Sequence, residues 1–137
     1  MKKIICIVLV LMVTFCFAGC GAKPVSRDDF YFYRDGQVTQ NPDMGSAEQD
    51  GLVASSLTDE TTYRGIKYGS TRDDLKKAYG DYIKVLDVDQ STDFKAAEAF
   101  IVESDDYVLI IYVQDGTVSM AAIWTRSAYE NPPEIVG

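Results

Sequence analysis

The chain has 137 residues, of which 21 are acidic and 13 are basic, and its formal net charge is −8. It contains no histidine, which excludes Ser-His-Asp and Cys-His nucleophilic chemistry and zinc sites built on imidazole. The acidic balance also argues against nucleic acid as a partner, because phosphate contacts need clustered lysine and arginine.

The N-terminal residues have the features of an export signal. Lys2 and Lys3 precede an apolar run over residues 4–17, and these 14 residues fall short of the roughly 20 that a membrane-spanning helix needs. A basic start, a short apolar run and small residues before a cut are typical of a secretory signal peptide. We therefore expect residues 1–19 to be removed.

The run ends in FAGC at residues 17–20, which resembles the lipobox of bacterial lipoproteins. In that motif the cysteine thiol receives a diacylglyceryl group and cleavage leaves the cysteine first, so the resemblance implies lipidation of Cys20. Two acyl chains suffice for stable anchoring. The alternative is an ordinary signal peptide followed by a cysteine without a special role. We predict an extracytoplasmic protein, lipid-anchored to the cell membrane, with no cofactor other than this covalent diacylglycerol.

Removal of residues 1–19 leaves 118 residues, a normal size for one domain, and changes the formal net charge to −10. Residues 20–29 are expected to be the lipidated cysteine and a tether, which at ~3.3 Å per residue would reach roughly 30 Å. Anionic lipid head groups are expected to repel the acidic domain.

Residues 30–60 predict a small hairpin followed by a loop. The aromatic residues 30–33 precede Asp35 and Gly36, a pair that suits a type I′ turn. This aromatic run is expected to complete the core, or, as the alternative, to stack on a sugar or a partner. Turn-forming and acidic residues over 40–60 indicate a loop, with a short helix near residues 46–50 as an option.

The sequence TYRGIKYG at residues 62–69 is expected to be a strand, and STRDDLKKAYG at residues 70–80 a helix. Ser70 or Thr71 can cap the first turn, and Gly80 supplies the C-terminal stop. An apolar stripe at helical spacing is formed by Leu75, Ala78 and Tyr79.

Four strands are predicted to follow, at residues 82–88, 94–102, 107–113 and 117–125. Asp115 and Gly116 predict a two-residue turn between the last two strands. Directly opposed residues share a face, so the core face is expected to carry Tyr107, Leu109, Ile111, Val113, Val118, Met120 and Trp124, with Phe100 and Val102. Glu98 falls on this face, so we expect it near an edge or at a register shift. The predicted fold is α+β, with a short helical segment packed on one face of an antiparallel meander sheet of about four strands.

The opposite face of the predicted sheet is also apolar, whereas the face of a sheet that is exposed to solvent usually carries polar residues. Either residues 30–60 cover it, or it is a shallow docking surface for another protein. The candidate interaction residues on this face are Ile101, Val108, Ile110, Tyr112 and Ile123.

Residues 64–82, RGIKYGSTRDDLKKAYGDY, are similar to a repeated unit of small exported lipoproteins, with matches at Gly65, Gly69, Ser70, Leu75, Tyr79 and Gly80. The segment resembles the SmpA/OmlA outer-membrane lipoproteins and the fold of the β-lactamase inhibitor proteins (BLIP-like), in outline over residues 61–126. The resemblance implies a helical segment followed by an antiparallel meander, and protein–protein interaction at the cell envelope without catalysis. Residues 127–137 are expected to be an extended tail.

Residues 87–98 imitate a calcium-binding loop, with side-chain oxygens at alternate positions (Asp87, Asp89, Ser91, Asp93) and Glu98 at position 12. Thr92 stands where such a loop needs glycine, so an acidic turn between strands is the favoured interpretation. The carboxylates of residues 103–106 and of Asp115 are expected too far apart for shared acid–base chemistry. We therefore expect a non-catalytic module that binds an envelope or secreted protein, or, as the alternative, a ligand- or cation-binding module that uses the turn 87–93.

Overall fold

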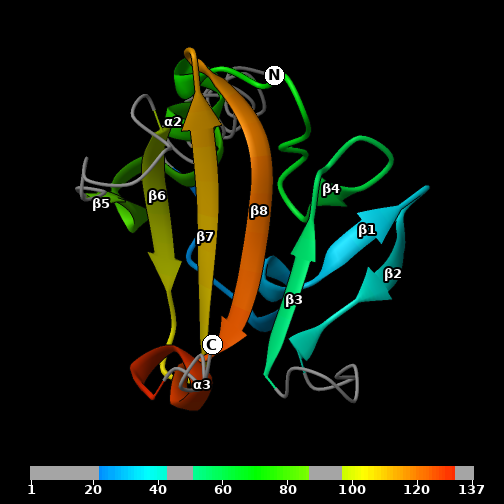
Figure 1. The fold of residues 1–137 in the computed structure, drawn as a ribbon, viewed down its shortest axis with the longest axis vertical. Coiled ribbons are helices and arrows are strands. Elements are labelled where there is room, and N and C mark those ends of the chain that lie inside the picture. Colours follow the sequence, from blue (N-terminus) through cyan, green and yellow to red (C-terminus); the bar gives the residue numbers. More distant parts are fainter. Residues whose placement is uncertain (1–21, 43–50, 87–96, 132–137) are drawn as a thin grey trace, which may run out of the picture.

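The structure is a computed structural model, and it describes residues 22–42, 51–86 and 97–131. Two antiparallel sheets and several short helices make up this part of the chain (Figure 1), which confirms the predicted α+β class. In chain order the elements are η1 (Arg27–Phe30), β1 (Phe32–Arg34), β2 (Gln37–Gln40), β3 (Leu52–Ser55), β4 (Thr61–Thr62), α2 (Arg72–Tyr79), η3 (Gly80–Tyr82), β5 (Ile83–Leu86), β6 (Ala97–Glu103), β7 (Tyr107–Gln114), β8 (Thr117–Thr125) and α3 (Arg126–Glu130). The optional helix near residues 46–50 lies outside the described residues, and so does the predicted tail from residue 132 onward. Residues 127–130 of that tail are not extended, because they belong to α3.

The larger sheet has five strands in the order β3-β8-β7-β6-β5, and the smaller sheet has three in the order β2-β1-β4. Strands β5 to β8 form the predicted meander. The prediction of about four strands is wrong, because β3 pairs with β8 as a fifth strand and places Val53 opposite Ile123 (Figure 1). This strand is a four-residue run inside a segment rich in turn formers, so it lacks the length that would distinguish it from a loop.

Both predicted hairpin turns are confirmed. Asp35 and Gly36 join β1 to β2 with φ angles of 52° and 77°. Asp115 and Gly116 join β7 to β8 with φ angles of 52° and 84°. A type I′ turn requires positive φ at both central residues, and Asp and Gly adopt it at low cost.

Helix α2 begins at the predicted cap, and Thr71 rather than Ser70 is the capping residue. The Thr71 hydroxyl accepts a hydrogen bond from the backbone N–H of Asp74 (3.2 Å), and the Asp74 carboxylate accepts one from the backbone N–H of Thr71 (2.9 Å). The backbone hydrogen bond from Thr71 is the main reason that the pKa of Asp74 lies below its ordinary value. Leu75 and Tyr79 on the opposite side of the helix are fully buried.

The predicted strand at residues 62–69 is wrong. Only Thr61 and Thr62 form a strand, and the chain then turns at Gly65 (φ 82°) and Gly69 (φ 86°). The backbone N–H of Gly69 donates to the carbonyl of Val118 at 2.9 Å, which fixes the segment against β8. Residues 63–70 therefore form a structured loop, called the motif loop below.

A β-bulge sets the register between β7 and β8. Val113 lies opposite Val118 as predicted, but Ile111 then pairs with Ala121 instead of Met120. Ser119 is the extra residue on β8. A shift of one residue moves every later side chain to the other face of the sheet.

Because of this register shift, the prediction that Met120 and Trp124 lie in the core is wrong. Trp124 packs with the residues of the opposite face, and Met120 is exposed. Ala121 and Ile123 take the core positions instead.

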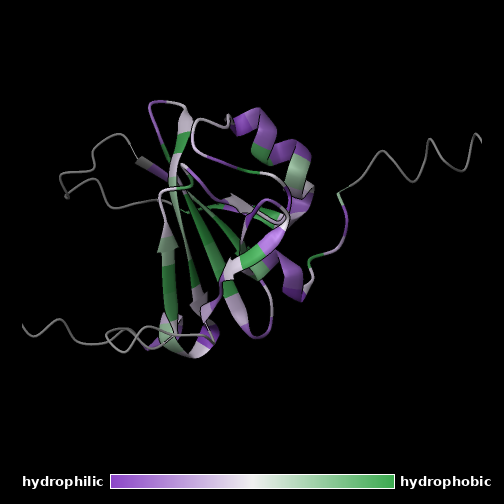
Figure 2. Ribbon diagram, turned by 90° about the vertical axis from the view of Figure 1, so that its right-hand side faces the viewer, coloured by the Kyte–Doolittle hydropathy of each residue, from purple (hydrophilic) through white to green (hydrophobic). Residues whose placement is uncertain are grey.

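The main core lies between the five-stranded sheet, α2 and the N-terminal hairpin. Figure 2 shows α2 beside one face of the sheet, with hydrophobic residues concentrated in the strands behind it. The buried members of the core are Phe30, Phe32, Leu57, Ile66, Leu75, Tyr79, Phe100, Val102, Tyr107, Leu109, Ile111, Val113, Val118, Ala121 and Ile123. The described residues of the segment 30–60 thus complete this core, and do not cover the opposite face as one alternative predicted.

Glu60 connects the two sheets. Its buried carboxylate accepts hydrogen bonds from Thr39 and Gln40 of β2 and from Ser55 of β3. A buried carboxylate loses its hydration, and hydrogen bonds from several donors compensate for this cost. The contact therefore fixes the small sheet against the edge strand of the large one.

Candidate functional site

The predicted interaction face is buried in the structure. Ile101, Val108 and Ile110 share one face of the large sheet and are 6%, 0% and 5% exposed. Tyr112 lies half-buried beside them, and burial raises its pKa. Side chains this closed to solvent do not form a free docking surface.

The register shift also changes which residues belong to this face. Ile123 was predicted on it but lies in the main core. Trp124 and Tyr129 of α3 pack against the face instead. Within the described part of the chain, the indole N–H of Trp124 is buried without an acceptor. The face is therefore best described as a second, smaller apolar cluster.

The acidic candidates are not assembled into a site by the described residues. Asp87, Asp89 and Asp93 lie outside them. Glu98 lies at the start of β6, and Arg72 of α2 donates to its carboxylate, with Nε 2.8 Å from Oε2. Within residues 22–42, 51–86 and 97–131, no group of three or more His, Cys, Asp or Glu side chains is placed to hold a metal ion.

Cys20, the predicted lipidation residue, lies outside the described residues. No helix among those that are described is long and apolar enough to cross a membrane. The described residues begin at Ala22, two positions after Cys20, and Ala22 lies against Gly80 at the end of α2. A β-carbon added to Gly80 would lie 3.0 Å from that of Ala22.

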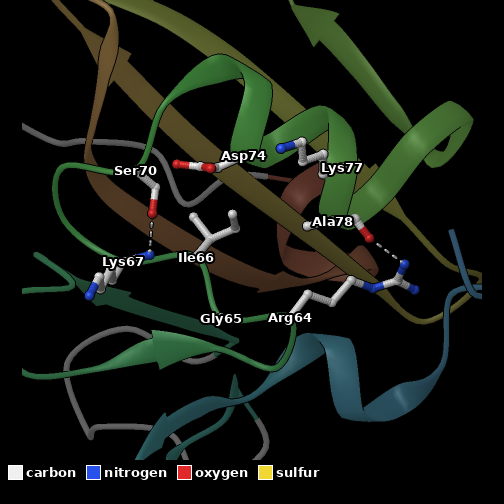
Figure 3. Close-up of a pocket in the computed structure, with 8 residues that line it drawn as sticks. All are labelled: Arg64, Gly65, Ile66, Lys67, Ser70, Asp74, Lys77 and Ala78. Carbon is white, nitrogen blue, oxygen red and sulfur yellow. Dashed lines mark hydrogen bonds between the residues drawn. The ribbon is translucent and has the colours of Figure 1, made fainter.

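Arg64 of the motif loop holds this N-terminal segment to the domain. Figure 3 shows its guanidinium bound to the carbonyl of Ala78. Its Nε and Nη2 donate to the two carboxylate oxygens of Asp29 at 2.7 and 3.1 Å. Its Nη1 donates to the carbonyl of Ala78 at 2.8 Å, and Nη2 also donates to the carbonyl of Pro24 at 3.1 Å. The Asp29 side chain has no solvent exposure, and that of Arg64 is 10% exposed.

This arrangement, called the Arg64 clamp below, has two consequences. The hydrogen bond with Asp29 is the main reason that the pKa of Arg64 is raised, so the guanidinium stays charged. The residues that the sequence assigned to a tether are, from Ala22 onward, packed against the domain. The extended reach that a free tether would have is not available to them.

An open depression of about 420 Å³ lies beside the clamp, between the motif loop and α2 (Figure 3). Ile66 is buried there, and the polar lining includes Lys67, Ser70, Asp74 and Lys77. Its volume falls in the range of about 300–1,000 Å³ that ligand pockets occupy. The lining combines two lysines with the carboxylate of Asp74, and Arg64 beside it is paired with Asp29.

Tyrosines form an exposed surface on the small sheet. Phe30 and Phe32 are buried in the main core, and the alternate residues Tyr31 and Tyr33 are partly exposed. The ring of Tyr33 lies 6.4 Å from that of Tyr31 and 5.6 Å from that of Tyr63, measured between centroids. Tyr63 is 53% exposed. These three residues are called the tyrosine surface below.

The tyrosine surface is held in place by polar contacts as well. The Tyr33 hydroxyl donates to the carbonyl of Asp28 at 2.9 Å. Burial first, and the charge of Asp28 second, raise the pKa of Tyr33 to about 12. The phenol is therefore neutral at physiological pH and available as a fixed hydrogen-bonding group.

The sequence pattern found only part of these sites. It identified the aromatic run 30–33, and the alternation of Phe with Tyr is a signal that could have separated the inward from the outward side chains. The approach of Tyr63 to Tyr33 has no local signal. The same holds for the ion pair of Asp29 with Arg64, which are 35 residues apart.

Comparison of the chain with protein-family models, with curated proteins and with solved structures found no match in any of the three. The resemblance of residues 64–82 to the SmpA/OmlA lipoproteins therefore stays a prediction. The structure gives the motif residues structural roles, because Gly65 and Gly69 form turns while Leu75 and Tyr79 pack in the core.

Asp29→Asn tests the Arg64 clamp. The variant keeps the size of the side chain but leaves the guanidinium without its charged partner, so we expect the free energy of unfolding to fall by about 3 kcal/mol, the lower end for a broken buried ion pair. Urea denaturation measures the change. The matched control is Glu98→Gln, whose ion pair with Arg72 is exposed, and it should change stability much less. Equal effects of the two variants would contradict a structural role for the clamp.

Proposed function

We propose that the chain is a bacterial lipoprotein, anchored to the cell membrane through a diacylglycerol on Cys20, and that its domain binds another envelope or secreted protein without catalysing a reaction. The observation that supports the interaction most strongly is the tyrosine surface. The rings of Tyr31 and Tyr63 each contact that of Tyr33 of the small sheet, and all three side chains are at least partly exposed to solvent.

The chemistry of these side chains suits protein binding. Tyrosine combines a large apolar ring with a polar tip and is enriched among the residues that contribute most to protein interfaces. Tyr33 is already ordered by its ring contacts and by its bond to Asp28. A partner therefore meets a surface whose side chains lose little further conformational entropy on binding.

The position of the tyrosine surface also fits an anchored protein. Tyr31 and Tyr33 follow the N-terminal segment directly, and Tyr63 precedes Arg64 of the clamp. The residues that would carry the domain on its lipid anchor and those that would meet a partner thus belong to one connected structure.

Cys20→Ser tests the anchor. The hydroxyl cannot form the thioether, so the variant is expected in the soluble fraction or unprocessed, while the wild-type protein stays with the membrane. Mass spectrometry of the wild-type protein should show a chain that starts at Cys20 and carries a diacylglyceryl group. A bare thiol, or a start at another residue, would disprove the anchor.

Photo-crosslinking in the producing cells tests the interaction. A photoreactive phenylalanine at position 63 should give one discrete protein adduct, whereas the same group at Val85, which is similarly exposed, should give none. Adding Tyr31→Ala should weaken the adduct at position 63 by removing a neighbouring contact. No adduct at position 63, or equal adducts at both positions, would count against the tyrosine surface as the binding site.

A further inference from the structure

Tyr33 joins the three rings of the tyrosine surface. Its ring makes an angle of 62° with that of Tyr31 and of 40° with that of Tyr63, so the rings form a stepped surface of faces and edges. Val38 of β2 and Thr61 of β4 lie in register with Tyr33 on either side of it. Directly opposed residues share a face of the sheet. An occupant of the surface therefore meets ring and methyl groups across all three strands.

Two hydroxyl groups of the surface are able to donate hydrogen bonds to an occupant. The Tyr31 hydroxyl accepts a bond from Nε of Arg27 at 2.6 Å, which leaves its own proton unused. No acceptor for the Tyr63 hydroxyl lies in the described part of the chain. The Tyr33 hydroxyl is already used, because it donates to the carbonyl of Asp28. The surface therefore suits a partner that offers hydrogen-bond acceptors.

The charges that border the tyrosine surface come in adjacent pairs of opposite sign. Arg27 is followed by Asp28, and Arg34 is followed by Asp35, and all four residues are exposed. Adjacent charges of opposite sign leave little net field to attract a charged partner. The phenol of Tyr33 is neutral as well, because burial raises its pKa to about 12. An uncharged segment thus matches the surface better than a strongly basic or acidic one.

The edges of the small sheet are poorly suited to the addition of a partner strand. On β4, the N–H of Thr62 donates to the carbonyl of Ile66 at 2.9 Å, and the carbonyl of Thr62 accepts from the N–H of Gly65 at 3.0 Å. On β2, a bulge at Thr39 interrupts the ladder, and bulges protect edge strands from further pairing. A partner is therefore expected to bind through its side chains and carbonyl groups.

We propose that the tyrosine surface binds a proline-rich segment of its protein partner, in the extended polyproline II conformation. The inference rests on the proposed protein-binding function and adds to it the chemistry of the partner. Polyproline II has no internal hydrogen bonds, so its carbonyl groups can accept from the hydroxyls of Tyr31 and Tyr63. Proline has no N–H that would need an acceptor. Its segments are ordered before binding and pack on aromatic side chains, so they lose little conformational entropy.

The dimensions of the surface agree with this conformation. One turn of polyproline II contains three residues and is about 9 Å long. The rings of Tyr31 and Tyr63 lie 6.4 and 5.6 Å from that of Tyr33. A segment that crosses all three rings therefore has about one turn in contact with them.

The first test uses the full chain in detergent micelles, with isotope-labelled tyrosine rings, and an oligoproline of three turns, which is about nine residues. The NMR signals of Tyr31, Tyr33 and Tyr63 should shift to saturation, whereas those of the exposed Tyr68 and Tyr82 should not. A flexible glycine–serine peptide of the same length is the control, and it should shift none of them. Added salt should leave the affinity for oligoproline unchanged, because neither side carries a net charge.

Variants of Tyr63 test which groups bind the peptide. Tyr63→Ala removes a ring and a hydroxyl and should weaken oligoproline binding about tenfold. Tyr63→Phe keeps the ring and should weaken it about fivefold. Tyr68 is similarly exposed, at 59% against 53% for Tyr63, and Tyr68→Ala should leave binding unchanged. Circular dichroism checks that the variants fold, and equal binding by the two alanine variants would overturn the proposal.

The photo-crosslinked adduct at position 63 separates this inference from the proposed function. Mass spectrometry of the adduct should place the cross-link in a proline-rich segment, and excess oligoproline should suppress it. A cross-link in a segment without proline, or one that oligoproline leaves unchanged, contradicts the proline-rich partner but not protein binding. The absence of any adduct contradicts both. If a chitin oligosaccharide shifts the three tyrosine signals and oligoproline does not, the surface is a sugar-binding site and the proposal is wrong.

Discussion

The carboxylate of Asp29 has no contact with solvent, and burying a charge costs several kcal/mol unless a partner and hydrogen bonds compensate for it. Arg64 supplies the partner, and the backbone N–H of Ser26 donates a further bond at 2.9 Å. Because the same guanidinium binds the carbonyls of Ala78 and Pro24, these groups are all satisfied only when the N-terminal segment, the motif loop and α2 are in place together. The rest of the account depends on this contact, since it determines where the first described residues of the chain lie.

An anchored domain with a free tether samples many orientations, whereas a domain clamped close to its lipid has few. Here Ala22, two residues after Cys20, is packed against Gly80. Under the proposed lipid anchor, this geometry presents the tyrosine surface from a fixed scaffold. Orientation then lowers the entropic cost of meeting a partner that is itself confined to the envelope.

Local signals in the sequence predicted the parts of the fold that local chemistry decides. The Asp-Gly turns, the cap at Thr71, helix α2 and the order of strands β5 to β8 follow from neighbouring residues. The rest depends on contacts between distant segments or on irregularities. No feature of the sequence indicates the bulge at Ser119. Because of it, Trp124 and Ile123 lie on the opposite faces of the sheet from those predicted, which changes the predicted interaction surface. The pairing of β3 with β8 and the Arg64 clamp are long-range contacts that no spacing in the sequence reveals.

The most direct test is the mobility of the N-terminal segment, measured by backbone amide relaxation in the full chain held in detergent micelles. If the clamp places this segment as the structure has it, the order parameters of residues 22–30 should match those of the core strands, at about 0.85. Values below about 0.6 over these residues would mean a flexible tether. That result would contradict the clamp as an organising contact.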